Sequence, residues 1–185
     1  MYGYSSADAL ALYGVLSGMV MPFLLFPSSI TNSIAVMLLP AVADSKAAGQ
    51  EKQVKHYVTT SSLYCLLMGF AFTLFFLLFG NLIGNLCFHN ETAGTFLRIL
   101  SWLCPFLYLS TTLGSIINGL GKNRQTFFIT VISQSIKLCS LVFCVPHFGI
   151  MAYLIGILIS QIVMALLSCL CLHLYFRENH SSKCW

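Results

Sequence analysis

The sequence predicts an all-α integral membrane protein in which five transmembrane helices form a single helical bundle. Of its 185 residues, 58% are hydrophobic and only 8% are charged, against the roughly 25% charged residues of a soluble domain. Its apolar runs are long enough to cross a hydrocarbon core of about 30 Å, and they do not alternate as barrel strands do. The runs cover residues 12–40, 57–79, 96–120, 126–145 and 150–175.

The first run, residues 12–40, contains features that interrupt a helix. Pro22 and Pro27 each remove a backbone hydrogen bond and bend the chain, and a cluster of small polar residues that includes Asn32 follows them. Transporters bind substrate near interrupted helices of this kind, so Asn32 is a candidate substrate-binding residue. A kinked packing helix explains the pattern equally well. The second run, residues 57–79, is rich in phenylalanine and carries no charge.

The third run, residues 96–120, carries a polar stripe on one helix face. Its members recur at steps of three or four residues: Ser101, Pro105, Tyr108, Thr112, Ser115 and Gly119. Side chains on such a stripe either form hydrogen bonds between helices or line a cavity, and both roles remain open here. On the second alternative, Tyr108 is a candidate substrate-binding residue. The glycine-rich segment after Asn118 predicts the end of the helix.

The fourth run, residues 126–145, has a polar stripe that contains a lysine. Thr126, Thr130, Ser133, Lys137, Ser140 and Cys144 share one helix face, and Gln134 borders it. Lys137 lies roughly 18 Å from the start of the run at 1.5 Å per residue, and burying it at that depth costs about 2.5 to 3.5 kcal/mol. We therefore expect its ammonium group to face a cavity lined by water or protein.

Function and structure remain alternatives for this stripe. An intramembrane charge favours an anion or coupling-ion site, for which Lys137, Gln134, Ser133 and Thr130 are the candidate substrate-binding residues. The alternative is a lysine that is neutral or that only binds helix-end carbonyl groups. In the last run, residues 150–175, Gly156 and Ser160 belong to a small-residue ridge typical of helix packing.

The distribution of basic residues predicts the orientation in the membrane. Seven of the nine follow the first, third and fifth runs: Lys46, Lys52, Lys55, Lys122, Arg124, Arg177 and Lys183. Short loops rich in Lys and Arg stay cytoplasmic, so we expect the amino terminus outside and the carboxyl terminus inside. Arg98, at the outer start of the third run, is expected to lift its head group to the interface.

Several function classes lack their sequence signatures. The enzyme motifs G-x-S-x-G and H-E-x-x-H are missing, as is any pair of carboxylates within a run, so no enzyme is expected. The eight cysteines show no zinc-ligand spacing, and we expect neither a metal nor a cofactor. The net charge of +4 suits contact with anionic membrane lipids; aromatic and basic residues do not interleave as nucleic-acid binding would require.

Three stretches carry a resemblance to a known family. They are LLFPSSITNSIAVMLLPAVADSKAAGQ (24–50), SSLYCLLMGFAFTLFFLLFGNLIGNLCFHN (61–90) and PFLYLSTTLGSIINGLGKNRQTFF (105–128). In the first, Pro27, Ile30, Thr31, Ile34, Leu38, Pro40, Val42 and Ala43 match a long family helix. The chain resembles the polysaccharide and lipid-oligosaccharide flippases of the multidrug/oligosaccharidyl-lipid/polysaccharide superfamily, and most closely the stage V sporulation protein B branch.

The resemblance implies a partial architecture and a cargo. Members of this family have two six-helix lobes around a central cavity, and the chain resembles the second lobe without its first helix. It implies movement of a polyprenyl-pyrophosphate-linked sugar across the bacterial cytoplasmic membrane by alternating access. The chain would then either be truncated or split, or assemble with a companion that supplies the missing amino-terminal lobe. Lys137 and the stripe around it would be the candidates for receiving the pyrophosphate charge.

Two other functions remain as alternatives. A cation-coupled multidrug antiporter lobe would carry an acidic group inside the membrane, and none of the five runs contains Asp or Glu. An anionic cargo is therefore favoured. The second alternative is a membrane fragment without transport activity, whose polar groups only hold the helices together.

Overall fold

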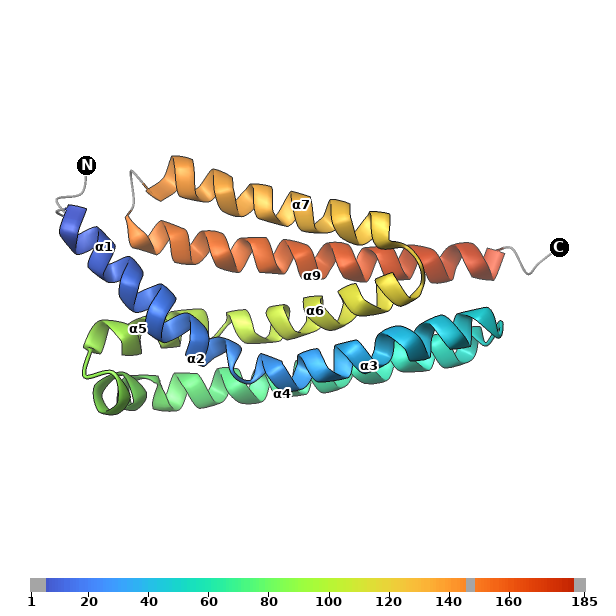
Figure 1. The fold of residues 1–185 in the computed structure, drawn as a ribbon, viewed down its shortest axis with the longest axis horizontal. Coiled ribbons are helices and arrows are strands. Elements are labelled where there is room, and N and C mark those ends of the chain that lie inside the picture. The colour runs from blue at the N-terminus through green and yellow to red at the C-terminus, as the bar shows by residue number, and fades with distance from the viewer. Residues whose placement is uncertain (1–5, 146–148, 182–185) are drawn as a thin grey trace.

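The computed structural model describes residues 6–145 and 149–181, and its elements in these ranges are all helical. In chain order they are α1 (Ser6–Val15), the π-helical turn η1 (Leu16–Val20), α2 (Met21–Leu25), α3 (Ser28–Ala47), α4 (Glu51–Cys87), α5 (Glu91–Leu100), α6 (Leu103–Gly119), α7 (Asn123–Cys139), the π-helical turn η2 (Ser140–Cys144) and α9 (Ile150–Ser181). The predicted all-α class is confirmed. Helix α6 lies between α9 on one side and the α3–α4 pair on the other, and α7 covers the far side of α9 (Figure 1).

The described helices include three that are long and apolar enough to cross a membrane by themselves. They are Glu51–Cys87, Asn123–Cys144 and Ile150–Arg177. Two further stretches are long and apolar enough to cross a membrane only when two consecutive helices are counted together. They are Leu10–Leu25 with Ser28–Ala47, which are bent by 55° relative to each other, and Glu91–Leu100 with Leu103–Gly119, which are bent by 52°. If each bent pair is one span, these stretches make five spans. The membrane helical bundle is confirmed, whereas the treatment of the whole chain as one five-span domain stays a prediction.

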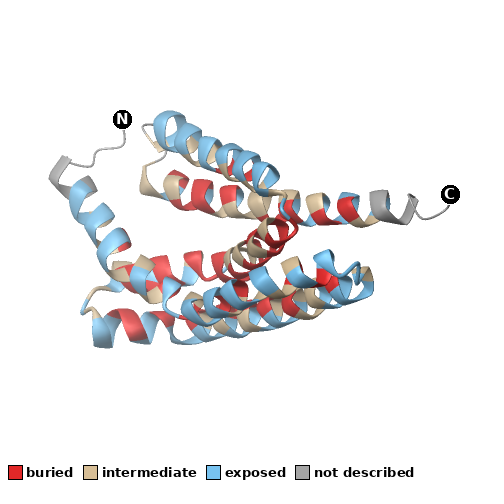
Figure 2. Ribbon diagram, turned by 45° about the vertical axis from the view of Figure 1, so that its right-hand side comes forward, coloured by how far each residue is buried: buried red, intermediate tan, exposed pale blue. Residues whose placement is uncertain are grey.

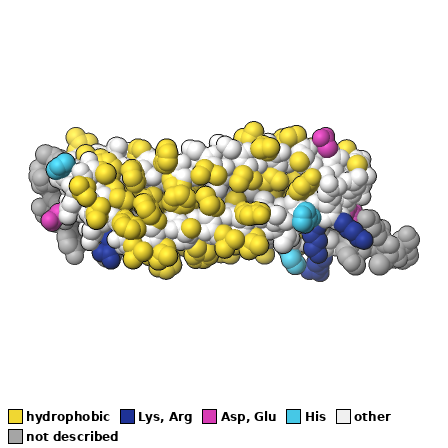
Figure 3. Space-filling model, turned by 90° about the horizontal axis from the view of Figure 1, so that it is seen from below, with side chains coloured by type: hydrophobic (Ala, Val, Ile, Leu, Met, Phe, Trp, Pro, Cys, Tyr) yellow, Lys and Arg dark blue, Asp and Glu magenta, His cyan; other side chains and the backbone are white. Residues whose placement is uncertain are grey.

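The surface has the polarity of a molecule that is surrounded by lipid. Hydrophobic side chains cover the middle of the face drawn in Figure 3, and the charged side chains gather toward its two ends. Large apolar residues that a soluble protein would bury are exposed: the exposed fraction is 80% for Phe26 and 70% for Phe143. Burial is concentrated instead where α6 meets its neighbours (Figure 2). Acyl chains are the solvent that suits such a surface.

The first bent span is broken at Pro27, as the sequence predicted for this run. A proline has no N–H, and its ring disfavours a continuous helix, so backbone carbonyl groups just before the break lose their helical donors. The Ser28 hydroxyl donates to the carbonyl oxygen of Leu25 at 2.5 Å. The hydroxyl of Tyr108, from α6, donates to the carbonyl oxygen of Leu24 at 3.3 Å. The break is thus stabilised by a donor from a different helix.

The second bent span is broken between α5 and α6 in the same way. Pro105 cannot donate to the carbonyl oxygen of Ser101, four residues earlier. The hydroxyl of Thr73, from α4, shares its hydrogen between that oxygen, at 2.9 Å, and the carbonyl oxygen of Gly69, at 2.8 Å. Helix α4 can approach the break so closely because Gly69 has no side chain where it meets Pro105.

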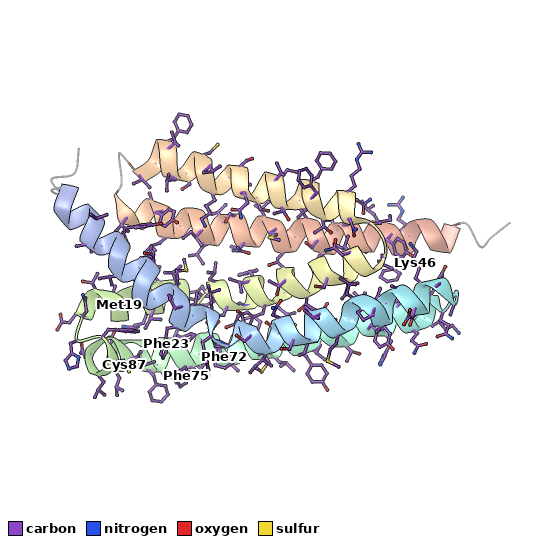
Figure 4. The ribbon with its side chains drawn as sticks, viewed as in Figure 1. Met19, Phe23, Lys46, Phe72, Phe75 and Cys87 are labelled. Carbon is purple, nitrogen blue, oxygen red and sulfur yellow. The ribbon has the colours of Figure 1, made fainter. Side chains whose placement is uncertain are left out.

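Aromatic side chains hold the first bent span against α4. Phe23 of α2 packs edge-on against Phe76, with ring centroids 6.1 Å apart, and against Phe88, at 5.8 Å. Phe72 and Phe75 extend this cluster along α4 (Figure 4). The phenylalanine-rich second run therefore contributes part of the core and not only a lipid-facing surface.

Helix ends follow local signals. Asn90 caps α5, because its side chain accepts from the backbone N–H of Thr92 at 2.9 Å. At the other end of the bundle, α6 ends at Gly119, and Gly121 adopts a positive φ of 69°. The N–H of Lys122 then returns to the carbonyl oxygen of Ile117 at 3.1 Å, which satisfies the last turn. The helix end predicted after Asn118 is confirmed.

Candidate functional site

The polar stripe of α7 lies along its contact with α9 and continues toward α6. Ser133 is 4% exposed, and the Ser140 hydroxyl donates to the carbonyl oxygen of Ala152 in α9 at 3.2 Å. Gly156 of α9 makes room for Ser140, because a Cβ at that glycine would collide with the serine side chain. These contacts are of the structural kind that small and hydroxylated residues form between membrane helices.

Lys137 lies at the edge of this contact and is partly buried. It follows Thr126 by about three turns on the same helix face, and the Thr126 methyl group lies 4.0 Å from the position of a Cβ at Gly114 of α6. The contact of this helix face with α6 is thus at the Thr126 end of α7, whereas along most of its length α7 packs against α9. Within residues 6–145 and 149–181, no hydrogen bond or ion pair engages the ammonium group of Lys137.

Hydroxyl and amide groups lie on α7 within about three turns before Lys137. The hydroxyl oxygens of Thr126 and Ser133 are buried without a hydrogen-bond partner in the described part of the chain. Thr130 donates to the carbonyl oxygen of Thr126 at 2.9 Å and keeps its lone pairs, and Gln134 is exposed. Buried hydroxyl groups without a partner cost free energy, so this face of α7 gains from any polar occupant.

The other two predicted site residues lie elsewhere. Tyr108 is fully buried, at 0% exposure, and its hydroxyl binds the Leu24 carbonyl oxygen. The sequence left two roles open for Tyr108, an interhelical hydrogen bond and the lining of a cavity. This contact is the interhelical hydrogen bond. Asn32 lies on the exposed side of α3, a helix that packs against α6 and α4, whereas α7 packs mainly against α9. Lys137, Gln134, Ser133 and Thr130 thus lie within two turns of one helix, whereas Asn32 and Tyr108 belong to other helices.

A contact at the lysine-rich end of the bundle was missed by sequence reasoning. Lys46, the last basic residue of α3, donates from Nζ to the carbonyl oxygen of Leu120 at 2.6 Å (Figure 4). The Tyr175 ring of α9 lies under two ammonium groups, with Lys122 at 4.8 Å and Lys46 at 5.9 Å from its centroid. These contacts join α3, α6 and α9. The sequence contains only two separate signals for this contact. Lysines are in excess in the loops at this end of the bundle, and Tyr175 lies at the end of the last run.

The described residues contain no group of three or more His, Cys, Asp or Glu side chains that could hold a metal ion. The cysteines among them are free. The candidate site is therefore an ammonium group with neighbouring hydroxyl and amide groups, suited to binding an anion.

Comparison with known proteins identifies the family. Residues 1–145 match the MatE family. The chain belongs to the MatE family. This family consists of membrane transporters rather than enzymes, within the multidrug/oligosaccharidyl-lipid/polysaccharide superfamily, and the resemblance found in the sequence is confirmed.

One curated relative is similar to nearly the whole chain. The chain is 23% identical over 168 residues to Stage V sporulation protein B of Bacillus subtilis (strain 168). The aligned region covers 89% of this chain and 32% of that protein. The chain thus spans about a third of the length of the relative it matches. No solved structure matches this MatE-family chain.

Proposed function

We propose that this chain is part of a flippase that moves a polyprenyl-pyrophosphate-linked sugar from the inner to the outer leaflet of the bacterial cytoplasmic membrane. The observation that carries the proposal is Lys137, which is partly buried in α7 and has no hydrogen-bond or ion-pair partner among the described residues, one turn after the buried Ser133 hydroxyl that also lacks a partner there. An anion is the ligand that this donor set suits. A cation-coupled antiporter fits less well, because the five apolar runs contain no carboxylate.

In the proposed cycle, the bent spans allow alternating access. Their breaks, at Pro27 and between α5 and α6, are closely linked, because Tyr108 binds one and lies a single turn after Pro105 at the other. In transporters, interrupted helices of this kind border the substrate site. In the proposed cycle, the pyrophosphate is held by Lys137 while the helices tilt about these two points.

Activity is proposed for a two-lobe assembly rather than for this chain by itself. A MatE-type cavity lies between two lobes, and the chain spans 32% of its relative. We propose that the missing lobe faces the polar side of α7 and completes the cavity, with membrane lipids around the remaining surface. The amino terminus would lie outside and the carboxyl terminus inside.

The proposal is tested by transport in reconstituted vesicles. The vesicles contain this chain together with the part of Stage V sporulation protein B that it does not match, and a fluorescent lipid-linked disaccharide that a membrane-impermeant reductant bleaches. Lys137→Ala should lower the transport rate at least about tenfold, the loss expected for one charge-assisted hydrogen bond. Lys137→Arg should retain part of the rate, because it keeps the charge.

The matched control is Lys55→Ala, which removes an exposed lysine from α4 and should leave the rate unchanged. Both variants should insert into the membrane in equal amounts. A normal rate for Lys137→Ala would remove the site assignment. A rate that stays at background for the unsubstituted chain with its companion would favour a fragment without transport activity.

A further inference from the structure

A second donor-rich site lies in a groove at the other end of the bundle from the lysine-rich loops. The groove has a volume of about 500 Å³ and is formed by α4, α5 and α9. Its polar wall consists of Asn81, Thr95, Arg98 and Trp102, and its apolar wall includes Leu77 and Leu158. None of the candidate residues on α7 lines it, so this groove is separate from the site around Lys137.

The polar groups in the groove are mostly donors without partners. The guanidinium group of Arg98 and the side-chain amide of Asn81 make no hydrogen bond or ion pair with the residues that the structure describes. The indole N–H of Trp102 also lacks an acceptor there. The described residues that line the groove include no carboxylate. A guanidinium fork beside an amide and an indole N–H matches the oxygen atoms of a phosphate group.

Packing fixes the stem of Arg98 against α4. A Cβ at Gly80 would lie 2.8 Å from Cγ of Arg98, so the arginine stem occupies the space that this glycine leaves open. The stem is thus held against the neighbouring helix while its head group remains exposed. Because the Arg98 stem is already ordered, less conformational entropy is lost when a ligand binds its head group.

The depth of the groove matches the head-group region of a bilayer. Arg98 lies about 10 Å along the axis from the start of α5, at 1.5 Å per residue. Trp102 is 53% exposed, and tryptophan prefers the membrane interface. Leu77 and Leu158 provide an apolar surface next to the donors. A ligand that fits both walls carries a phosphate group and a hydrocarbon chain.

We propose that this groove binds the phosphate group of an anionic membrane lipid, with Arg98 as its principal donor and one acyl chain along Leu77 and Leu158. The site is separate from the proposed transport site and holds whether or not the chain transports a sugar. Free inorganic phosphate shares the head-group chemistry but lacks the chain. A helix from another part of a longer protein would cover the groove without needing its donors.

The test uses Trp102 as the reporter in the 185-residue chain with Trp185→Phe. The protein is placed in phosphatidylcholine vesicles that contain either brominated phosphatidic acid or brominated phosphatidylcholine, and quenching of tryptophan fluorescence is measured against mole fraction. Phosphatidic acid should quench at an about fivefold lower mole fraction, the preference expected for one cationic side chain at an anionic head group. Arg98→Gln should abolish this preference, and Arg98→Lys should retain part of it.

The matched control is Arg177→Gln, which removes an exposed arginine from α9 and should leave the fivefold preference unchanged. Equal quenching by both lipids in the unsubstituted protein would overturn the proposal, as would a preference that survives Arg98→Gln. Loss of the preference on addition of inorganic phosphate would assign the groove to the free anion. Absence of quenching by either lipid would mean that protein covers the groove.

Discussion

Single hydroxyl groups stabilise the two places where prolines interrupt the helices. Tyr108 and Thr73 each donate to a backbone carbonyl oxygen at a break. Tyr108 is 84 residues from its acceptor in the sequence, and Thr73 is 28 residues from its acceptor at the second break. Within a bilayer no water replaces such a donor. The Leu24 carbonyl group therefore depends on Tyr108, whereas the Ser101 carbonyl oxygen also accepts from the Cys104 N–H at 3.1 Å. The side chain of one helix therefore determines whether a bend in another is tolerated.

Tyr108→Phe should lower the free energy of unfolding by about 1 kcal/mol, the range found for hydrogen bonds between membrane helices. The ring is fully buried and is retained in phenylalanine, so the change isolates the donated hydrogen bond. Unfolding by sodium dodecyl sulfate in mixed micelles measures the effect. Tyr64→Phe is the control, because Tyr64 is 60% exposed on α4; an equal effect of the two substitutions would refute the assigned role.

The sequence predicted the polar stripe of residues 96–120, but not what each member does. Periodicity identifies the face on which Tyr108 lies. It does not identify its acceptor, because the Leu24 carbonyl group becomes available only after Pro27 breaks a different helix. The bond between Lys46 and the Leu120 carbonyl oxygen escaped prediction for the same reason. Both depend on which helices become neighbours in the folded chain.

At the scale of helices, glycines decide how closely α4 approaches its partners. A Cβ at Gly84 would lie 2.6 Å from the Cα of Gly94 in α5. A Cβ at Gly69 would collide with backbone and ring atoms of Pro105. Backbone and ring atoms cannot move aside as a flexible side chain can, so the two helices would have to separate.

Gly69→Ala should lower the free energy of unfolding by about 2 kcal/mol, the usual cost of forcing extra volume into a packed contact. Separation of α4 from the break would also lengthen the Thr73 hydrogen bond to Ser101, which is now 2.9 Å. Gly14→Ala is the control: nothing lies within 4 Å of a Cβ there, and alanine favours a helix more than glycine does. The same titration compares them, and equal stability of the two variants would contradict the close contact.

Helix ends and bends were predicted unevenly. The second run was assigned to residues 57–79, whereas α4 extends over Glu51–Cys87, because hydropathy marks the part of a helix in lipid and not its polar ends. The bend in the first span followed from Pro27. The 52° bend between α5 and α6 was not predicted, since Pro105 was read only as a member of a stripe. A proline early in a helix frees a carbonyl group four residues before it.

The whole molecule has two chemically different ends. The end with the α3–α4 and α6–α7 connections carries Lys46, Lys52, Lys55, Lys122 and Arg124, whereas the α4–α5 connection has His89 and Glu91. The charge asymmetry was readable from the sequence, because it requires only the order of spans and loops. The rule that basic loops remain inside predicts that the lysine-rich end faces the cytoplasm.

Helix α4 offers a direct test of this orientation. Its 37 residues extend about 55 Å at 1.5 Å per residue, well beyond a hydrocarbon core of about 30 Å, so both of its ends emerge from the membrane. Cys87 is exposed at one end, and Gln53 is exposed at the other. In a background without other cysteines, one protein retains Cys87 and a second carries Gln53→Cys in its place.

With the amino terminus outside, a membrane-impermeant maleimide should label Cys87 in intact cells. The same reagent should label Gln53→Cys only after the membrane is permeabilised. Because the two thiols are on one rigid helix and both are exposed, a difference in labelling reports the side of the membrane and not a difference in burial. The reverse pattern would invert the orientation, and would move Arg98 and its groove to the cytoplasmic leaflet. Labelling of both thiols in intact cells would show that the basic loops do not determine the topology of this chain.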